Sequence, residues 1–437
     1  MKIIKTPIIP HKQTFVKVKN QLHELDFKAI CVFTALGFFL DDDTYWLDTK
    51  VLRPATINTI DDNGFLIDSK KWFHWHYTPR EITIDDATSE FTHLFEAIIK
   101  EGVSDKNVIL PLSGGLDSRT QAVALHKLKA HVKSYSYSFL NGYKESKISK
   151  KIAKVLNFQF DEYTIPKGYL WKDIDELAHI NKCYSEFTHP RQMAVIGDIS
   201  ELGEVFSLGH WGDVLFDSDE LGDLTEKELT TILAKKIIKK GGLELAENLW
   251  TNWQIEGNFK DYLNERLLCL WNNIKIDDNS AKIRAFKSLY WAPRWTSVNL
   301  AVFENKKPIQ LPYYDDRMCE FICTIPEEFL ANRKIQIEYI KNNSKEAASV
   351  MWQDKRPFNL FTFHWHKFPY NLPYRIQSKL FRVVNQILGR KHVQRNWELQ
   401  FLGTDNEQHL KNAIFDSEFN ERFISKCIIS KFYHNFK

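Results

Sequence analysis

The chain has 437 residues and a mass of 51.5 kDa, enough for two or three domains of ordinary size. Hydrophobic residues make up 43% and charged residues 26%, a globular balance that excludes a disordered chain. With 59 basic and 56 acidic residues the net charge is only +3, too small to predict a nucleic-acid partner. The six cysteines include no CxxC pair, which argues against a disulfide scaffold or a structural zinc site.

Residues 1–85 are expected to form a small α+β unit. The N-terminus shows no apolar stretch followed by a cleavage site, so no secretory signal is predicted and a cytoplasmic location is expected. The most apolar run, 29–40, has twelve residues and would rise about 18 Å as a helix, against about 30 Å of hydrocarbon in a membrane. A buried core helix is therefore predicted there, and no transmembrane segment is expected.

A helix and then an alternating series of elements follow. Phe91, Leu94, Phe95, Ile98 and Ile99 recur at helical spacing, and Gly102 is expected to end that helix. Short apolar strands are predicted over 107–112, 132–139, 158–165 and 205–208, with helices after the first strand and near 147–156. This alternation predicts an α/β fold with a parallel sheet and helices on both faces. Beyond Leu224 the helical period dominates, so a helical second lobe is expected.

The most informative segment is Ser113-Gly114-Gly115-Leu116-Asp117-Ser118, between the first strand of this series and its helix. Two glycines let the backbone approach a ligand, and successive N–H groups at a helix N-terminus favour an anion. The hydroxyls of Ser113 and Ser118 can donate to phosphate oxygens, and Asp117 beside phosphates implies a cation such as Mg²⁺. The Walker pattern GxxxxGK[ST] is absent. A glycine turn that merely joins strand to helix is the less favoured interpretation.

This segment resembles the SGGxDS loop of the ATP pyrophosphatases, which split ATP between the α and β phosphates. More narrowly, residues 25–360 resemble the asparagine synthetase family, which includes β-lactam synthetases and lasso-peptide cyclases. The resemblance implies an adenine nucleotide α-hydrolase-like domain over 86–370 that uses ATP and Mg²⁺, followed by a helical, basic extension over 371–437. It also implies that ATP is held by Leu112, Ser113, Gly114, Gly115, Asp117, Ser118, Ser138 and Gly209.

Later segments carry the same resemblance, with departures. Asp213 matches an aspartate that the family uses with Asp117 to hold Mg²⁺ and pyrophosphate, whereas Val214 replaces the family's final acid. Pro312-Tyr313-Tyr314-Asp315 resembles a family signature, but Gln310 and Pro308 replace an arginine and a glutamate ahead of it. An acceptor other than aspartate is therefore expected.

Two candidate catalytic residues follow from the resemblance. Lys355, within 352–358, matches the family's active-site lysine; without that match a solvated surface lysine would be the preferred interpretation. His210 occupies a position where relatives have a glutamate or tyrosine linked to deprotonation of the attacking nitrogen, a task that suits imidazole. A histidine that makes a structural hydrogen bond beside Trp211 is an equally weighted alternative.

The nitrogen source is constrained by the N-terminal unit, which resembles only the tail of the family's glutaminase domain. Glutamine-using members begin with a catalytic cysteine at position 2, where this chain has Lys2. Glutamine hydrolysis is therefore not expected on this chain. Free ammonia, a separate glutaminase or an amine-bearing substrate would supply the nitrogen.

These residues together predict an ATP-dependent ligase that adenylates a carboxylate and forms an amide, as in surface-polysaccharide or natural-product biosynthesis. The carboxylate is expected on a small molecule, a sugar or a peptide. One alternative is a degenerate nucleotide-binding regulatory subunit, which Val214, Gln310 and Pro308 favour. Another is a tRNA-modifying N-type pyrophosphatase, which the small net charge disfavours.

Two further patterns have structural interpretations. Residues 371–395 contain six basic residues and no acid, with a helical stripe of Ile376, Leu380, Val383 and Ile387. A packed helix with a solvated basic face is favoured there over docking on anionic lipid or a polyanionic substrate. Cys319 and Cys323 are expected to be buried apolar side chains rather than a metal pair.

Overall fold

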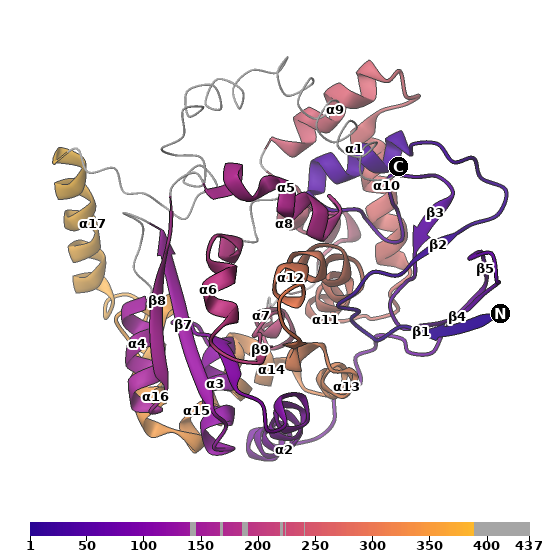
Figure 1. The fold of residues 1–437 in the computed structure, drawn as a ribbon. Coiled ribbons are helices and arrows are strands. Elements are labelled where there is room, and N and C mark those ends of the chain that lie inside the picture. Colours follow the sequence, from indigo (N-terminus) through magenta and orange to yellow (C-terminus); the bar gives the residue numbers. More distant parts are fainter. Residues whose placement is uncertain are drawn as a thin grey trace.

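The centre of the molecule is a five-stranded sheet in which every neighbouring pair of strands is parallel. The computed structural model describes residues 1–139, 146–166, 169–185, 191–218, 222, 224–239 and 241–388. Figure 1 shows the sheet flanked by helices, so the predicted α/β architecture is confirmed. In spatial order the strands are β10 (Ile309–Gln310), β9 (Val205–Ser207), β6 (Val108–Pro111), β7 (Val132–Phe139) and β8 (Gln159–Ile165).

The strand order contains a reversal beside β6. The chain runs from β6 outward to β7 and β8, then returns to place β9 and β10 on the other side of β6. At such a reversal the loops that follow the two central strands diverge, and a crevice opens at their carboxyl ends. The loop between β6 and α3 (Asp117–Lys127) and the loop between β9 and α7 (Gly212–Leu215) meet here.

The long helix α2 (Ile84–Val103), which precedes the sheet in the chain, has a buried face that includes Phe91, Phe95, Ile98 and Ile99. The prediction that Gly102 ends this helix is wrong, because Gly102 lies in its last turn and Ser104 forms the C-cap. A Cβ at Gly102 would overlap the side chain of Gln310, whose Nε2 donates to the carbonyls of Ile98 and Ile99 at 2.9 and 3.1 Å. The glycine therefore lets β10 pack against α2.

A helical lobe follows the sheet, as predicted. It contains α8 (Glu226–Ile237), α9 (Gly242–Asn252), α10 (Phe259–Asn272), α11 (Asn279–Phe286), η2 (Lys287–Thr296) and α12 (Ser297–Glu304). The η2 segment is a π-helix with Pro293 inside it, continuous with the α-helices on either side. Beyond β10 come α13 (Asp316–Cys323), α14 (Glu327–Leu330), α15 (Lys334–Asn343) and α16 (Lys345–Ser349). Cys319 and Cys323 are buried, as expected.

Shorter helices connect the strands of the sheet along the chain between β7 and β9. These are α4 (Ser146–Val155), α5 (Tyr169–Asn181), the 3₁₀ segment η1 (Arg191–Val195) and α6 (Ile196–Ser200). The predicted helix near 147–156 thus begins one residue earlier and ends one residue earlier than its sequence pattern suggested. Within the described residues, no helix is both long enough and apolar enough to cross a membrane.

The N-terminal unit is of mixed α and β structure. Antiparallel strands β1 (Lys2–Lys5), β4 (Thr56–Ile60) and β5 (Leu66–Lys71) form one small sheet, and β2 (Phe15–Lys17) pairs with β3 (Thr49–Val51). The predicted buried helix is present as α1 (Phe27–Leu36), with seven of its ten residues buried. It ends earlier than the apolar run because Gly37 adopts a left-handed conformation, with φ of 79°.

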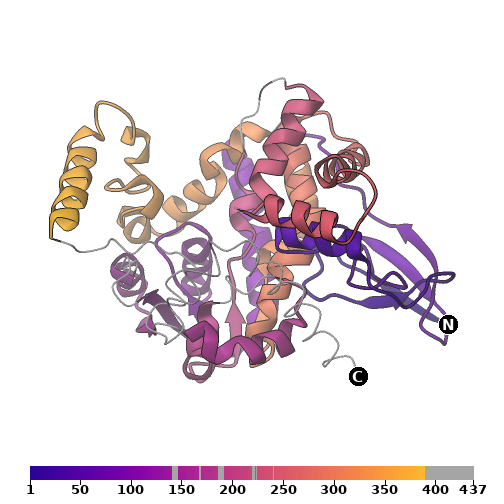
Figure 2. The ribbon, with the colours of Figure 1, turned by 90° about the horizontal axis from the view of Figure 1, so that it is seen from above.

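The last described element, α17 (Leu372–Ile387), stands apart from the body of the molecule (Figures 1 and 2). The prediction of a packed helix is wrong for this segment, because Ile376, Leu380, Val383 and Ile387 are all exposed. The basic residues Arg390, Lys391 and Arg395 lie outside the described residues.

Candidate active site

A cavity of about 520 Å³ lies at the reversal point between β6 and β9. Its walls come from three parts of the chain: the end of β6 with the start of α3, the loop after β9, and η2. β7 and Gln192 contribute the remaining surface. Of the residues predicted from the sequence, those that line the cavity are Leu112, Ser113, Asp117, Ser118, Gly209, His210 and Asp213.

The loop after β6 is held together by its two serines. The Ser113 N–H donates to Ser118 Oγ at 3.0 Å, the two hydroxyl oxygens are 3.0 Å apart, and the Gly115 N–H donates to Ser113 Oγ at 3.2 Å. Neither glycine of this loop has a left-handed φ. A Cβ at Gly114 would instead lie 2.6 Å from Gln353 Oε1, so this glycine makes room for the 352–355 segment and does not line the cavity.

The glycines of the second loop bring it against α3. A Cβ at Gly209 would lie 3.1 Å from Asp117 Cβ and 3.2 Å from the Ser118 nitrogen. At Gly212 it would overlap the Asp117 carboxylate and lie 2.8 Å from the Tyr313 ring. This close approach holds His210 and Asp213 in the same cavity as the serine hydroxyls.

Asp117 is engaged by residues that the sequence did not reveal. Arg333 Nη2 forms an ion pair with Asp117 Oδ1, and Gln336 Nε2 donates to the same oxygen at 3.2 Å. Gln336 also donates to Tyr313 Oη at 2.9 Å and accepts from Arg333 Nε at 2.8 Å. Arg333 is buried and adopts a left-handed φ of 63° just before α15. An isolated arginine at a helix start gives no recognisable sequence signal.

The third wall of the cavity, η2, adds a cation to the lining. Lys287, Trp291 and Trp295, each four residues apart on η2, all line the cavity. Desolvation raises the pKa of the Asp213 carboxyl, and the positive charge of Lys287 opposes that shift. Sequence reasoning missed these three residues. The one signal available was Pro293 within a helical pattern, since π-helical turns often occur at functional sites.

His210 lines the cavity with a neutral imidazole. Burial lowers its pKa to about 4, because the charged form loses hydration. Its Nδ1 has no hydrogen-bond partner among the described residues, and its ring lies edge-on to Phe303 at 6.4 Å. The indole of Trp211 donates instead to Ser288 Oγ at 3.0 Å. Among the described residues, the structural hydrogen bond considered for His210 beside Trp211 is therefore not found at Nδ1.

Besides Gly114 and Gly115, two further predicted residues lie outside the cavity lining. Ser138 is buried within β7, where Ser136 and Tyr137 reach the cavity instead. Lys355 lies beside Trp352, with Nζ 5.8 Å from the ring centroid; desolvation lowers the pKa of His366, and the charge of Lys355 adds to that shift. The structure therefore does not bring Lys355 together with Asp213 and the serines.

The sequence model of the asparagine synthase family matches residues 90–196. Over these residues the chain is asparagine synthetase-like. The matched segment runs from within α2 to the start of α6 and contains the serine-glycine loop after β6, so the resemblance noted from the sequence is confirmed over these residues. Asp213, His210, Lys287 and Lys355 lie outside it. A search of curated protein sequences finds no significant match.

Similar solved structures include the NMN synthetase of Francisella tularensis, 12% identical, with a TM-score of 0.24 over 47% of this chain and 93% of that one. The NH3-dependent NAD synthetase of Campylobacter jejuni is 16% identical, with a TM-score of 0.22 over 44% and 93%. The U34-tRNA thiolase NcsA of Methanococcus maripaludis is 15% identical, with a TM-score of 0.23 over 44% and 87%. Similarities this weak do not bear on function.

The family match supports an ATP-using enzyme of the ligase type. The cavity fits a nucleotide phosphate chain, because two serine hydroxyls and Lys287 surround it. Buried Nδ1 of His210 and buried Nε1 of Trp291 have no partner within the described part of the chain, so the wall is prepared for a polar ligand.

The carboxylates fit Mg²⁺ only together with phosphate oxygens. No cluster of three metal-ligating side chains occurs among the described residues, and the carboxylates that line the cavity are Asp117 and Asp213. Both contacts to Asp117 are made at Oδ1, which leaves Oδ2 for a further ligand. Mg²⁺ usually binds one or two carboxylates plus substrate phosphates, which matches this donor set.

Proposed function

We propose that the chain is an ATP-dependent ligase that adenylates a carboxylate, releases pyrophosphate and then forms an amide with ammonia or an amine. The supporting observation is the cavity at the strand reversal, which combines the family-matched loop with Asp213 and Lys287. The carboxylate would belong to a small molecule, a sugar or a peptide.

Adenylation is needed because a carboxylate has no acceptable leaving group at neutral pH. Transfer of AMP creates one, and the cost lies in charge that develops on the phosphates. Ser113 and Ser118 would donate hydrogen bonds to phosphate oxygens, with Lys287 as a fixed cation across the cavity. Mg²⁺, held by Asp213 and by Asp117 Oδ2, would neutralise charge on the pyrophosphate when bound. Lys287 would thus take the role that the resemblance assigned to Lys355.

His210 would accept the proton of the attacking nitrogen in the second half-reaction. With a pKa of about 4 its imidazole is neutral at pH 7 and so able to accept a proton. Its buried Nδ1 has no hydrogen-bond partner among the described residues, so its lone pair is not already used by a donor there.

The test is a screen of carboxylic acids for ATP–pyrophosphate exchange in the presence of Mg²⁺. One class of acid should support exchange, and adding ammonia or an amine should then yield AMP and amide. With ammonia, the rate should rise with pH as the neutral NH₃ fraction grows. The Asp213→Asn variant serves as the inactive control. Formation of ADP and orthophosphate with a verified acceptor would refute the proposal.

Two observations favour a second candidate, a nucleotide-binding regulatory subunit without turnover. Arg333 already neutralises Asp117, and Lys355 lies outside the cavity lining. This candidate requires Mg²⁺-dependent ATP binding with no exchange for any carboxylate. Calorimetric binding measured beside the exchange screen distinguishes the two.

A further inference from the structure

At the end of the described chain, α17 exposes apolar side chains of the kind that a globular protein normally buries. The side chains of α17 that repeat at helical spacing are aliphatic and exposed: Leu380 is 60% and Ile387 78% accessible, and Ile376, Val383 and Val384 are also exposed. Figures 1 and 2 show this helix separated from the body, at the end of the molecule opposite the N-terminal unit. An exposed apolar face of this kind marks an interaction surface.

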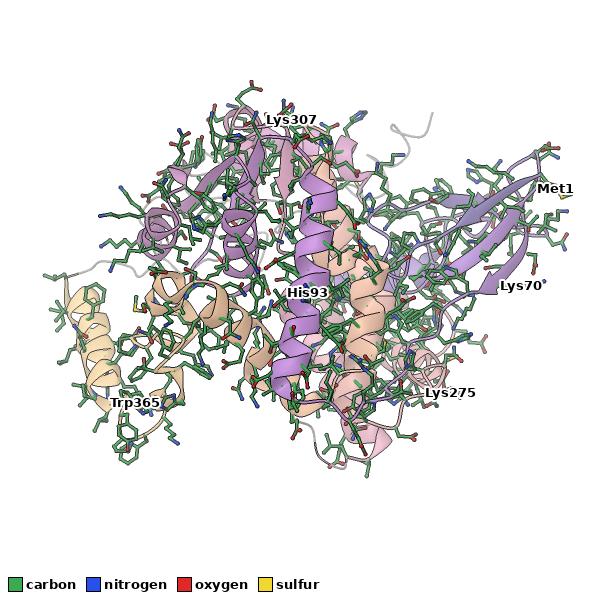
Figure 3. All side chains as sticks on the ribbon, turned by 90° about the horizontal axis from the view of Figure 1, so that it is seen from below. Met1, Lys70, His93, Lys275, Lys307 and Trp365 are labelled. Carbon is green, nitrogen blue, oxygen red and sulfur yellow. The ribbon has the colours of Figure 1, made fainter. Side chains whose placement is uncertain are left out.

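Aromatic side chains extend this apolar face toward the body. Trp365, Phe368 and Tyr370, just before α17, are 46%, 71% and 59% exposed. Figure 3 shows Trp365 pointing outward at the same end of the molecule. Tryptophan and tyrosine are the residues enriched where a protein meets the boundary between lipid and water.

The charged residues around α17 are all basic. Residues 355–397 contain nine lysines and arginines and no aspartate or glutamate, whereas the whole chain carries only +3. Arg375 and Lys379 lie on α17 itself, one helical turn apart. The positive charge of the protein is thus concentrated where its aliphatic residues are exposed.

We infer that α17 is an interfacial anchor that lies on an anionic lipid surface, with its aliphatic face in the acyl region and its basic residues at the headgroups. Basic charge beside a broad apolar face is the pattern of helices that lie in the plane of a membrane. A nucleic acid would satisfy the charges but leave Leu380 and Ile387 in water. The segment 396–437 has six acidic and five basic residues, so it offers no charge complement to the helix.

The test is sedimentation of the full chain with vesicles of phosphatidylglycerol and phosphatidylcholine, compared with phosphatidylcholine alone. Binding is expected only to the anionic vesicles and should weaken as salt is raised. Replacing Leu380→Glu and Ile387→Glu together should abolish binding. Replacing Arg375→Glu and Lys379→Glu should weaken it at least about tenfold, since each basic residue near such a surface contributes roughly one kcal/mol.

The matched control is Ile67→Glu, which replaces an exposed isoleucine on β5 at the other end of the molecule and should leave binding unchanged. Circular dichroism confirms that each variant is folded. The inference is overturned if no vesicles bind, or if the Leu380→Glu, Ile387→Glu variant still binds. It is also overturned if RNA binds the full chain more tightly than the anionic vesicles do. If the wild type is a dimer in solution and the Leu380→Glu, Ile387→Glu variant is a monomer, a second copy of the chain covers the helix, and the inference is likewise overturned.

Discussion

The two main walls of the cavity are built differently. The β6 wall, residues 111–118, is one continuous stretch in which hydroxyls, glycines and an aspartate occur within a few positions. The η2 wall consists of Lys287, Trp291 and Trp295 on a π-helix, and no sequence motif identifies these residues. A phosphate-binding site formed by one continuous loop can be predicted from the sequence, whereas a cavity wall whose residues come together only through tertiary packing cannot.

The walls also differ in charge. On the β6 wall Asp117 is paired with Arg333 and bonded by Gln336, so its charge is largely compensated within the protein. In the segment after β9, Asp213 is exposed to the cavity, and the cation Lys287 on η2 acts on its charge. We therefore expect Asp117 to matter for stability as well as for turnover, and Lys287 to matter for turnover.

The largest effect is expected for Asp117→Asn. This change strands the buried guanidinium of Arg333 and should lower the free energy of unfolding by about 3 kcal/mol, besides abolishing exchange. Urea unfolding measures the loss. Adding Arg333→Met removes the stranded charge and should restore much of the stability without restoring exchange. Glu101→Gln, which breaks the exposed ion pair with Arg317, is the control and should leave stability unchanged. Equal stability of Asp117→Asn and wild type would show that the pair is absent.

Next in size is the contrast between two lysines. Lys287→Met should reduce ATP–pyrophosphate exchange by about 10²–10³-fold, because it removes a fixed cation from the cavity. Lys355→Met should change exchange little, because its side chain lies beside Trp352. The reverse ranking would show that the 352–355 segment moves to the cavity when ATP binds, and that the sequence resemblance identified the lysine correctly.

A smaller and more selective effect is expected for His210→Ala. Exchange should survive, whereas amide formation should fall by about 10²-fold, at the lower end for a lost general base because so low a pKa makes a weak base. Protonation abolishes the base, so amide formation by the wild type should be lost only as pH falls through about 4. His210→Gln offers a control of similar size. An acid limb near pH 6.5 that vanishes in His210→Ala would contradict the burial of this imidazole.

Much of the fold was predictable, since the parallel strands are short apolar runs between glycine turns and helical patterns. The strand over 132–139 was predicted at its observed bounds, and the cavity residues of the β6 loop follow from one motif. Errors arose where tertiary contact overrides local pattern. Gly102 accommodates Gln310 instead of ending a helix, and the stripe on α17 is exposed instead of packed. Arg333 reaches Asp117 from 216 positions along the chain, a pairing that no single-sequence pattern encodes.

The most direct test of the proposed site is a structure of the full chain with Mg²⁺ and an ATP analogue whose α–β bridge is a methylene group. We expect the triphosphate between the Ser113 and Ser118 hydroxyls and Lys287, with Mg²⁺ at Asp213 and the base against Leu112 and Tyr137. The structure has another cavity, lined by residues that include His126, Lys129 and His131, at the amino ends of β6 and β7, and this cavity should remain empty. Nucleotide bound in that cavity, or a triphosphate that avoids the strand reversal, would contradict the assignment.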